Sequence, residues 1–414
     1  MKLPGNRTFR NLWAANTAST FGTMFGALSL TALIYLDASP TEMGSLAASA
    51  SLPVLLFALA AGVWVDRLPR VPIMVFADIG RFAVLMTVPL AAFLGDLHMQ
   101  QLYAVSFVTG CLNVLFDVAF RSALPALVPG ERLVDANSVL AMSASVSSTV
   151  SPAAGGAIAQ TAGAPVAVLL DAATFLLSGL LISRMPSMPR AARTRRRSAL
   201  VEAVEGFRTV TGLPVLRAVF GMVATYSFFS GFIITLFGLW VIEGLGFSAF
   251  TLGLLLAGGG IGSLAGAWLA APAAHRLGLG RSIVATYVVA AALLFLTPLA
   301  GGPVWVALTM LFIEQCIGDV FWAIHNVNAI TMRQRITPDE KLGRVNSAFL
   351  LASQGLRPVG ALVAGVTAEF LSIRAGLFIS SAGISLAALW LILSPLVRLD
   401  ESSCELSGND RVAG

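Results

Sequence analysis

The chain carries the stretch Pro129-Gly-Glu-Arg-Leu-Val-Asp-Ala-Asn-Ser138 and repeats it 209 positions later as Pro338-Asp-Glu-Lys-Leu-Gly-Arg-Val-Asn-Ser347. Half of the 414 residues is 207, which is close to the offset of 209, so the sequence consists of one unit that occurs twice. The same offset places Asp66-Arg67 on His275-Arg276, and Gly156 on Gly365. A repeat of half the chain predicts a fold made of two related structural units.

Composition places most of the chain in lipid. Hydrophobic residues make up 57% of the sequence and charged residues 11%, against roughly 45–50% and 25% in soluble domains. Apolar runs of about 20 residues, the length that crosses a bilayer core, can be counted twelve times. We place them at 12–36, 43–65, 73–95, 101–123, 137–160, 165–183, 217–241, 249–271, 282–300, 303–327, 346–370 and 375–397. The predicted fold class is an all-α membrane protein with twelve transmembrane helices.

The basic residues predict how the chain is oriented. If the N-terminus lies inside, the inner segments, counted together with Arg121 and Arg217 at the inner ends of their runs, hold 23 of the 26 Lys and Arg. The outer loops then hold only Arg374, and deeper positions of the predicted helices hold only Arg81 and Arg357. Short loops rich in Lys and Arg stay in the cytoplasm. We therefore expect a multi-pass protein of the cell membrane with both termini in the cytoplasm. The net charge of +5 is spread over several inner segments, which argues against a nucleic-acid partner.

One long polar stretch divides the chain. We expect an N-terminal six-helix bundle at 1–183, a basic cytoplasmic linker at 184–216, a C-terminal six-helix bundle at 217–398 and a polar cytoplasmic tail at 399–414. The linker holds Arg193-Thr-Arg-Arg-Arg197 and then an amphipathic segment at 199–210. Clustered arginines beside a membrane favour acidic headgroups, which predicts a surface helix facing anionic lipid. A regulatory docking site is the alternative.

The loop between the second and third runs reads Gly62-Val-Trp-Val-Asp-Arg-Leu-Pro-Arg70. Here the chain resembles the major facilitator superfamily, whose signature in this loop is G-x-x-x-D-R-x-x-R. Gly62, Asp66, Arg67 and Arg70 match it, and Pro69 stands where many members have Gly. The resemblance covers essentially the whole chain. It implies two pseudo-symmetric six-helix bundles, with Asp66 and the arginines forming a charge latch on the inner face. A plain positive-inside turn is the alternative.

The fifth run contains Ser147-Ser-Thr-Val-Ser-Pro-Ala-Ala-Gly-Gly156. It resembles the superfamily's antiporter signature, G-x-x-x-G-P-x-x-G-G, with Ser151, Pro152, Gly155 and Gly156 in its second half and serine at the first two glycine positions. A helix-packing face made of small residues is the alternative. Further segments resemble the branch that holds the enterobactin exporter and macrolide efflux proteins: Phe9-Arg-Asn-Leu-Trp13, Leu52-Pro53 and Ala77-Asp-Ile-Gly-Arg81.

Glu314 is the deepest carboxylate of the predicted helices. It lies near the middle of the tenth run, and Asp319 follows toward the inner side. An ionised side chain at the centre of a membrane helix costs about 2.5 to 3.5 kcal/mol, so it needs a partner or a function. We interpret Glu314 and Asp319 as carriers of a coupling proton. The alternative is a fixed ion pair of these carboxylates with the counter-charge Arg357.

The other charged residues of the helices receive different interpretations. Asp117 is a further proton-coupling candidate, but Arg121 one turn away could neutralise it. Asp78 and Arg81, three residues apart, predict a structural ion pair near the inner face. Asp171 lies close enough to the outer end of its run to reach water. The resemblance to the major facilitator superfamily places the third and sixth helices away from the central cavity, so we interpret Asp78, Arg81 and Asp171 as structural.

Aromatic and polar side chains predict a substrate cavity, with Tyr226, Phe229, Trp322 and Asn326 as candidates. Aromatic side chains that face lipid are the alternative. We expect His325 to be a satisfied histidine near a helix end rather than a proton relay. Cys111, Cys316 and Cys404 are scattered, which suggests neither disulfides nor a metal site. No cofactor is expected.

The sequence thus predicts a transporter and not an enzyme. We expect proton-coupled efflux of hydrophobic or amphiphilic small molecules, with protons and the lipid bilayer as the other partners and a monomer as the working form. A chain without a P-loop for ATP would draw its energy from an ion gradient. Alternatives are a proton-driven importer or uniporter of a small metabolite and, from another class, a non-transporting membrane sensor or scaffold.

Overall fold

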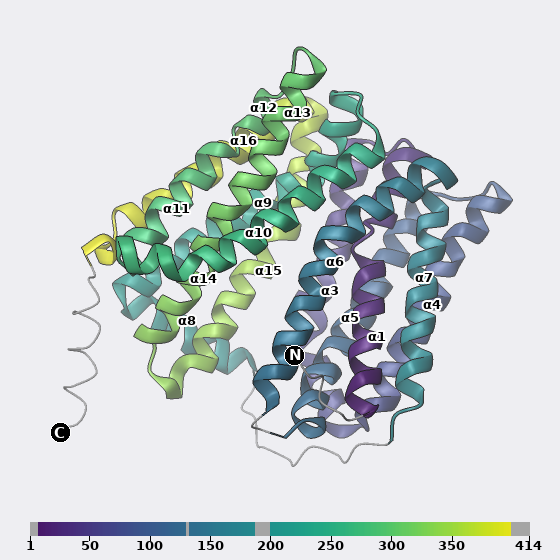
Figure 1. Cartoon of the computed structure of the whole chain (residues 1–414), viewed down its shortest axis with the longest axis horizontal. Coiled ribbons are helices and arrows are strands. Elements are labelled where there is room, and N and C mark those ends of the chain that lie inside the picture. The colour runs from purple at the N-terminus through teal and green to yellow at the C-terminus, as the bar shows by residue number, and fades with distance from the viewer. Residues whose placement is uncertain (1–6, 130–131, 187–198, 399–414) are drawn as a thin grey trace. The chain divides into compact units, whose positions relative to one another are not determined.

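The computed structural model describes residues 7–129, 132–186 and 199–398; it leaves out the side chains at 58–67, 134, 199–205, 339–340 and 397–398. Figure 1 shows these residues as helices joined by short turns, and no strand occurs within the described ranges. The chain divides into two compact units. Unit 1 comprises Met1–Arg195 and Val241–Ala257, and unit 2 comprises Arg196–Trp240 and Gly258–Gly414.

Unit 1 is built from helices that pack along one another. The purple-to-teal part of Figure 1 contains α1 (Arg7–Thr23), α2 (Ala27–Leu30), the π turn η1 (Thr31–Tyr35), α3 (Pro40–Arg67), α4 (Arg70–Leu94), α5 (Met99–Leu127), α6 (Leu133–Ala162) and α7 (Ala164–Ser183). The closest pairs are α3 with α5 and α4 with α7. Phe9, Met74, Phe116 and Ile182 lie in its core.

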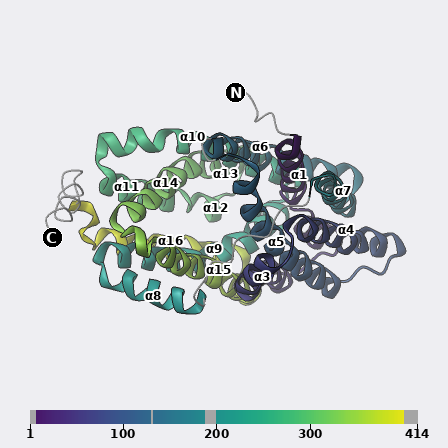
Figure 2. The same cartoon turned by 90° about the horizontal axis from the view of Figure 1, so that it is seen from below.

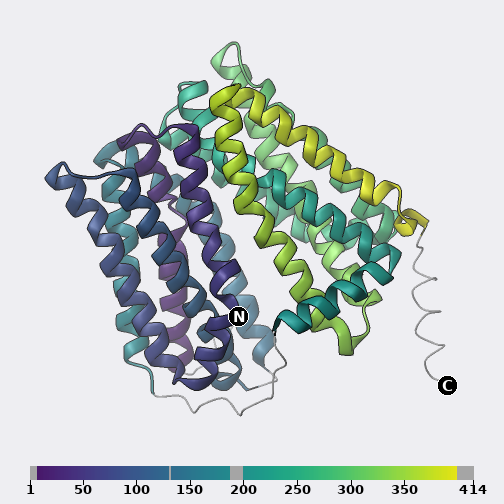
Figure 3. The same cartoon turned by 180° about the vertical axis from the view of Figure 1, so that it is seen from behind.

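Unit 2 begins with α8 and ends with η5. Its elements are α8 (Ala199–Gly212), α9 (Pro214–Leu239), the continuation of α10 (Ala249–Leu277), α11 (Leu279–Leu293), α12 (Leu296–Leu299), α13 (Val304–Ile313), the π turn η4 (Glu314–Gly318), α14 (Asp319–Ile336), α15 (Asp339–Phe370), α16 (Ile373–Ile392) and η5 (Pro395–Arg398). Figure 2 shows α11 beside α14, and Figure 3 shows α15 and α16 in yellow-green and yellow; both pack on α9. Leu216, Ile283, Tyr287 and Leu391 lie in the core.

The internal repeat is present in the backbone at the same offset of 209 residues. The π turn η1 (Thr31–Tyr35) recurs as η3 (Trp240–Gly244), and the left-handed residue after it, Asp37 with φ 52°, recurs as Gly246 with φ 70°. Helix α7 (Ala164–Ser183) recurs as α16 (Ile373–Ile392). The prediction of one unit written twice is therefore confirmed at the level of helix boundaries and turns.

Local chemistry explains where a repeated helix begins. The backbone N–H of Ser39 donates to Glu42 Oε2 at 2.9 Å, and the N–H of Glu42 donates to Ser39 Oγ at 3.3 Å, which is a capping box at the start of α3. At the same place in the second repeat, the N–H of Thr251 donates to Ser248 Oγ at 3.1 Å at the start of α10. A side-chain cap thus satisfies an exposed backbone donor in both repeats.

Each of the twelve predicted runs falls on a helix. Ten helices among the described residues are long and apolar enough to cross a membrane. Two more, α3 and α6, occupy the second and fifth runs with 28 and 30 residues. A total of twelve spans and their grouping into two six-helix bundles remain predictions. Several helices continue past the predicted runs; the tenth run, predicted at 303–327, ends at Ile336.

The amphipathic part of the predicted linker forms α8, so that helix is confirmed. Val210 is fully buried, and a Cβ on Gly206 would overlap the carbonyl oxygen of Arg344, so α8 packs closely on α15. Phe207 and Arg208 are exposed on the other face. The arginines at 193–197 and the tail at 399–414 lie outside the described residues.

Candidate functional site

The π turn η4 interrupts the long helix from Val304 to Ile336 and begins at Glu314. A π turn bonds residue i to residue i+5, so residues five apart lie one above the other. Glu314 and Asp319 are five apart, and the turn places both carboxylates on one face of the helix. In an uninterrupted α-helix, residues three or four apart would share that face.

These two carboxylates line a cavity of unit 2 that we call the carboxylate cavity. Its volume is about 180 Å³, and its polar lining side chains are Tyr226, Tyr287, Thr297, Glu314, Gln315, Asp319 and Trp322. No Lys or Arg is among the residues that line it. At about 30 Å³ per molecule the cavity has room for roughly six waters, and it is smaller than the roughly 300–1,000 Å³ of sites for drug-sized ligands.

Unsatisfied oxygen atoms face this cavity. Glu314 Oε2 and Thr297 Oγ1 are both buried, and neither makes a hydrogen bond of ordinary geometry with the described residues, although the two side chains lie near each other. Thr297 is only 2% exposed. A buried polar atom that lacks a hydrogen-bond partner has lost its hydrogen bonds to water without gaining others, which costs free energy. The cavity therefore suits a proton and a few waters better than a large organic molecule.

A second cavity of unit 2, of about 240 Å³, lies nearer the predicted cytoplasmic ends of its helices; we call it the arginine cavity. Its charged and polar lining residues include Arg333, Arg357, Asn326, His325, Ser227 and Ser353. Neither Asp nor Glu is among the lining residues. The Nε atoms of Arg333 and Arg357 are buried and lack a hydrogen-bond partner within the described ranges. The two cavities thus carry charged groups of opposite kinds.

An aromatic pair contributes to the walls of both cavities. The rings of Tyr226 and Trp322 are stacked with centroids 4.1 Å apart and planes at 23°, and both residues line each cavity. Trp322 also stacks on His325 at 5.4 Å. The ring nitrogen Nδ1 of His325 is 2.9 Å from the carbonyl oxygen of Ile283, and since a carbonyl only accepts, Nδ1 donates. His325 is therefore the satisfied histidine that the sequence predicts.

The predicted partnership between Arg357 and the carboxylates is absent from the ion pairs of the described residues. Those pairs are Asp78 with Arg81 and Asp96 with His98. Arg357 lines the arginine cavity, whereas Glu314 and Asp319 line the carboxylate cavity. The structure thus brings Glu314 and Asp319 together and leaves Arg357 in the other cavity.

Three of the four predicted substrate-cavity residues line the cavities of unit 2. Tyr226 and Trp322 line both, and Asn326 lines the arginine cavity. Phe229 lines neither; its ring packs against α16 where Gly383 leaves room for it. Asp117 lies on α5 with an exposed side chain and takes part in neither ion pair of the described residues.

Asp78 and Arg81 form the predicted ion pair, which confirms that prediction. Asp78 is fully buried and Arg81 is 3% exposed. The expectation that Asp171 reaches water is wrong: it is 7% exposed, and its Oδ1 is buried without a hydrogen-bond partner among the described residues. Its distance along the helix from the outer end suggested water, but packing against α1 at Gly22 covers it.

The inner-loop signature lies mostly outside the described side chains. Gly62, Asp66 and Arg67 belong to the last turns of α3, where only the backbone is described. Arg70 begins α4 and is 8% exposed. The latch therefore stays a prediction.

The small residues of the antiporter-like motif lie at close helix contacts within unit 1. A Cβ on Gly155 would meet the backbone of Phe25, and one on Gly156 would overlap the carbonyl oxygen of Ala249 at the start of α10. Pro152 lies within the continuous helix α6, and Ser151 is fully buried. These contacts are what a small-residue packing face requires.

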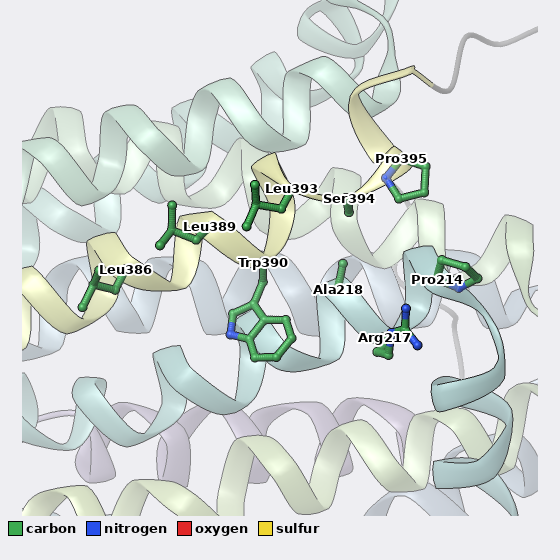
Figure 4. A pocket seen from close by; sticks show the side chains of 9 residues that line it. All are labelled: Pro214, Arg217, Ala218, Leu386, Leu389, Trp390, Leu393, Ser394 and Pro395. Atoms are coloured by element: carbon green, nitrogen blue, oxygen red, sulfur yellow. The ribbon is translucent and has the colours of Figure 1, made fainter.

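A cavity of about 450 Å³, larger than the carboxylate and arginine cavities, lies elsewhere in unit 2. Figure 4 shows it between α9 and α16, lined by Leu386, Leu389, Trp390 and Leu393 with Arg217 toward one end. These four apolar side chains are 47–82% exposed. Exposed apolar side chains on a membrane-crossing helix are typical of a surface that faces lipid, so this groove is a poor candidate for a polar site.

Sequence reasoning missed several residues of the two cavities. Arg333 was assigned to an inner loop because the apolar run ends before it, yet α14 continues to Ile336. The helical spacing of Trp322, Asn326 and Arg333, at i, i+4 and i+11, could have placed them on one face. Thr297 and Gln315 gave no signal in the sequence. No group of three or more His, Cys, Asp or Glu in the described part of the chain could hold a metal ion.

Comparisons with known proteins agree along nearly the whole chain. The family model described as transmembrane secretion effector matches residues 5–410. An MFS-type transporter of Sinorhizobium fredii, y4rN, is 27% identical over 375 residues, which cover 88% of this chain and 89% of that protein. The enterobactin exporter EntS of Salmonella typhimurium is 24% identical over 344 residues, covering 81% of this chain and 79% of the exporter.

Solved structures share the fold. A bacterial homologue of the iron transporter ferroportin, in an inward-facing state, has a TM-score of 0.72 at 16% identity and covers 93% of this chain and 98% of its own. The nucleoside transporter NupG has a TM-score of 0.73 at 11% identity, covering 94% and 98%. At these identities the likeness concerns the fold alone.

Proposed function

Because the chain belongs to the transmembrane secretion effectors of the major facilitator superfamily, and is therefore an integral membrane transporter and not an enzyme, we propose that it exports hydrophobic or amphiphilic small molecules in exchange for protons. The exporter EntS, related over 81% of this chain, supports the outward direction. The two repeats support alternating access, in which the halves of the protein rock around a central site. In this proposal the latch of Asp66, Arg67 and Arg70 stabilises one state of that cycle.

The observation that carries proton coupling is the unsatisfied Glu314 Oε2 in the carboxylate cavity. An ionised carboxylate in an apolar surrounding is costly unless it is paired, and no cation lines this cavity. Taking up a proton removes that cost, and losing it to water restores the charge when access changes. Asp319, on the same face and in the same cavity, is the second carboxylate of the proposed coupling site.

The first step in testing the proposed export is to identify a compound that the protein exports. In a host that lacks its own efflux pumps, expression of the chain is expected to raise resistance to at least one member of a panel such as ethidium, erythromycin and siderophores. The compound that responds is then followed in proteoliposomes with an imposed pH gradient. A chain that binds such a compound but produces no flux would act as a sensor, contrary to the proposal.

Glu314→Gln keeps the size and hydrogen-bonding capacity of the side chain but removes its titration. We expect this variant to lose uphill transport driven by the pH gradient, by at least about tenfold, while it keeps downhill exchange. Asp319→Asn should have the milder effect. Glu369→Gln, which neutralises an exposed carboxylate of α15, is the matched control and should transport like wild type. If Glu314→Gln still concentrates the substrate, the coupling site lies elsewhere, with Asp117 next to be tested.

A further inference from the structure

The arginine cavity has the composition of an anion site. Two guanidinium groups line it, both with a buried and unpartnered Nε, and no carboxylate lines it. Neither guanidinium is paired with a carboxylate within the described ranges. Arginine keeps its charge in proteins, so two like charges share a small partly buried space. Such an arrangement is costly when empty and is relieved by a bound anion.

The two arginines are held in place by their surroundings. The guanidinium of Arg333 lies over the ring of Phe349 at 4.6 Å, which leaves its edge free to donate. Arg357 comes from α15, where the backbone of α9 approaches so closely that a Cβ on Gly231 would meet the carbonyl oxygen of Arg357. This contact fixes the turn of α15 that carries Arg357. Asn326, from the same helix as Arg333, adds an exposed amide to the lining of the cavity.

The lining and the size of the cavity indicate what kind of molecule would carry the anionic group. Tyr226, Trp322 and Phe349 supply aromatic surface. A cavity of about 150 Å³ accommodates benzene, so the 240 Å³ of the arginine cavity leaves room for one ring and an acidic group. The planar guanidinium fork matches a planar carboxylate through paired hydrogen bonds.

We propose that the arginine cavity binds the carboxylate of an aromatic organic acid, and that Arg333 and Arg357 recognise it. The inference rests on the proposed function in one respect: it assigns an anionic, aromatic group to the exported amphiphile. The binding itself requires neither a gradient nor outward transport. It can therefore be tested on purified protein.

The experiment is a calorimetric titration of the full chain in detergent micelles with benzoate, and with benzamide as its neutral counterpart of nearly the same shape. Protein-free micelles give the blank. We expect benzoate to bind at least tenfold more tightly than benzamide. Arg333→Gln and Arg357→Gln should each weaken benzoate at least tenfold. Arg335→Gln, two residues from Arg333 and exposed outside the cavity, is the matched control and should bind like wild type.

Equal affinity for benzamide, no binding of benzoate, or an equal loss in Arg335→Gln would overturn the proposal. Binding of phenyl phosphate in the absence of benzoate binding would also overturn the assignment to a carboxylate. The comparison of benzoate with benzamide uses only the wild-type protein, so it stands even if a variant does not fold. If benzoate binds as expected but no panel compound is exported in proteoliposomes, the proposed export fails while the anion site remains.

Discussion

A single ion pair, Asp78 with Arg81, shows how a charge is accommodated inside unit 1. Ser178 Oγ donates to Asp78 Oδ2 at 2.7 Å, and Arg81 donates to Asn113 Oδ1. The guanidinium also lies over the rings of Phe116 at 4.5 Å and Phe175 at 4.2 Å. Arg81 Nε also donates to the carbonyl oxygen of Ala77 at 3.4 Å, one turn earlier on the same helix. The buried charge of Arg81 is thus accommodated by Ala77 and Asp78 of its own helix and by side chains of neighbouring helices.

We expect Asp78→Asn to destabilise the protein, because it leaves Arg81 buried without its counter-charge. Breaking a buried pair in this way costs about 3–5 kcal/mol. The measurement is thermal unfolding in detergent, followed by size-exclusion chromatography. Asp96→Asn removes a carboxylate that is 82% exposed and should change the free energy of unfolding by less than about 0.5 kcal/mol. Equal melting of the two variants would contradict the structural role of the pair.

At the scale of elements, α9 and α15 meet backbone to backbone. A Cβ on Gly360 would overlap the carbonyl oxygen of Phe228, and one on Gly231 would meet the backbone nitrogen of Ala361. Glycines let membrane helices approach closely, which strengthens their van der Waals contact. The same contact positions Arg357 in the arginine cavity.

Gly360→Ala should therefore push α15 away from α9. Overpacking of this kind costs about 1–3 kcal/mol, so we expect a lower melting temperature in detergent. Gly343→Ala is the control on the same helix: nothing lies within 4 Å of the added Cβ, and alanine favours the helix by roughly 0.5–1 kcal/mol. The close approach would be refuted if both variants melted like wild type.

At the scale of the whole molecule, the bias of basic residues predicts the orientation of every loop. It places Asp96, after α4, outside the cell, and Leu277, at the end of α10, in the cytoplasm. Both side chains are exposed, so cysteines placed there can be reached by a reagent. Orientation is thus open to measurement without knowledge of the substrate.

We expect Asp96→Cys to react with an impermeant maleimide on intact cells. Leu277→Cys should react only after the membrane is permeabilised. The background protein has Cys111, Cys316 and Cys404 replaced by Ser, so that only the introduced thiol reacts. The reverse pattern would mean that both termini face outward.

Hydropathy and the repeat predicted where the helices lie because both depend on local sequence. The spacing of Asp78 and Arg81 predicted their pairing for the same reason. The burial of Asp171 depends on another helix, and so does the placement of Arg357 away from Glu314. Arg333 was missed because a helix continues beyond the apolar run that indicated it. The contacts between helices therefore could not be predicted from the periodicity of the sequence.

The π turn at Glu314–Gly318 affects the membrane span and the binding site differently, because the span depends on helix length and the site depends on the direction of side chains around the helix. The bilayer responds to length, which grows by about 1.5 Å per residue. The geometry of a site depends on the rotation of side chains about the helix axis, which advances by about 100° per residue at 3.6 residues per turn. Deleting one residue from this turn would shorten the helix by a negligible fraction of the membrane thickness. It would also turn Asp319 and Trp322 by roughly a quarter of a revolution relative to Glu314. A single-residue gap in this segment of a related sequence therefore marks a changed site within an unchanged topology.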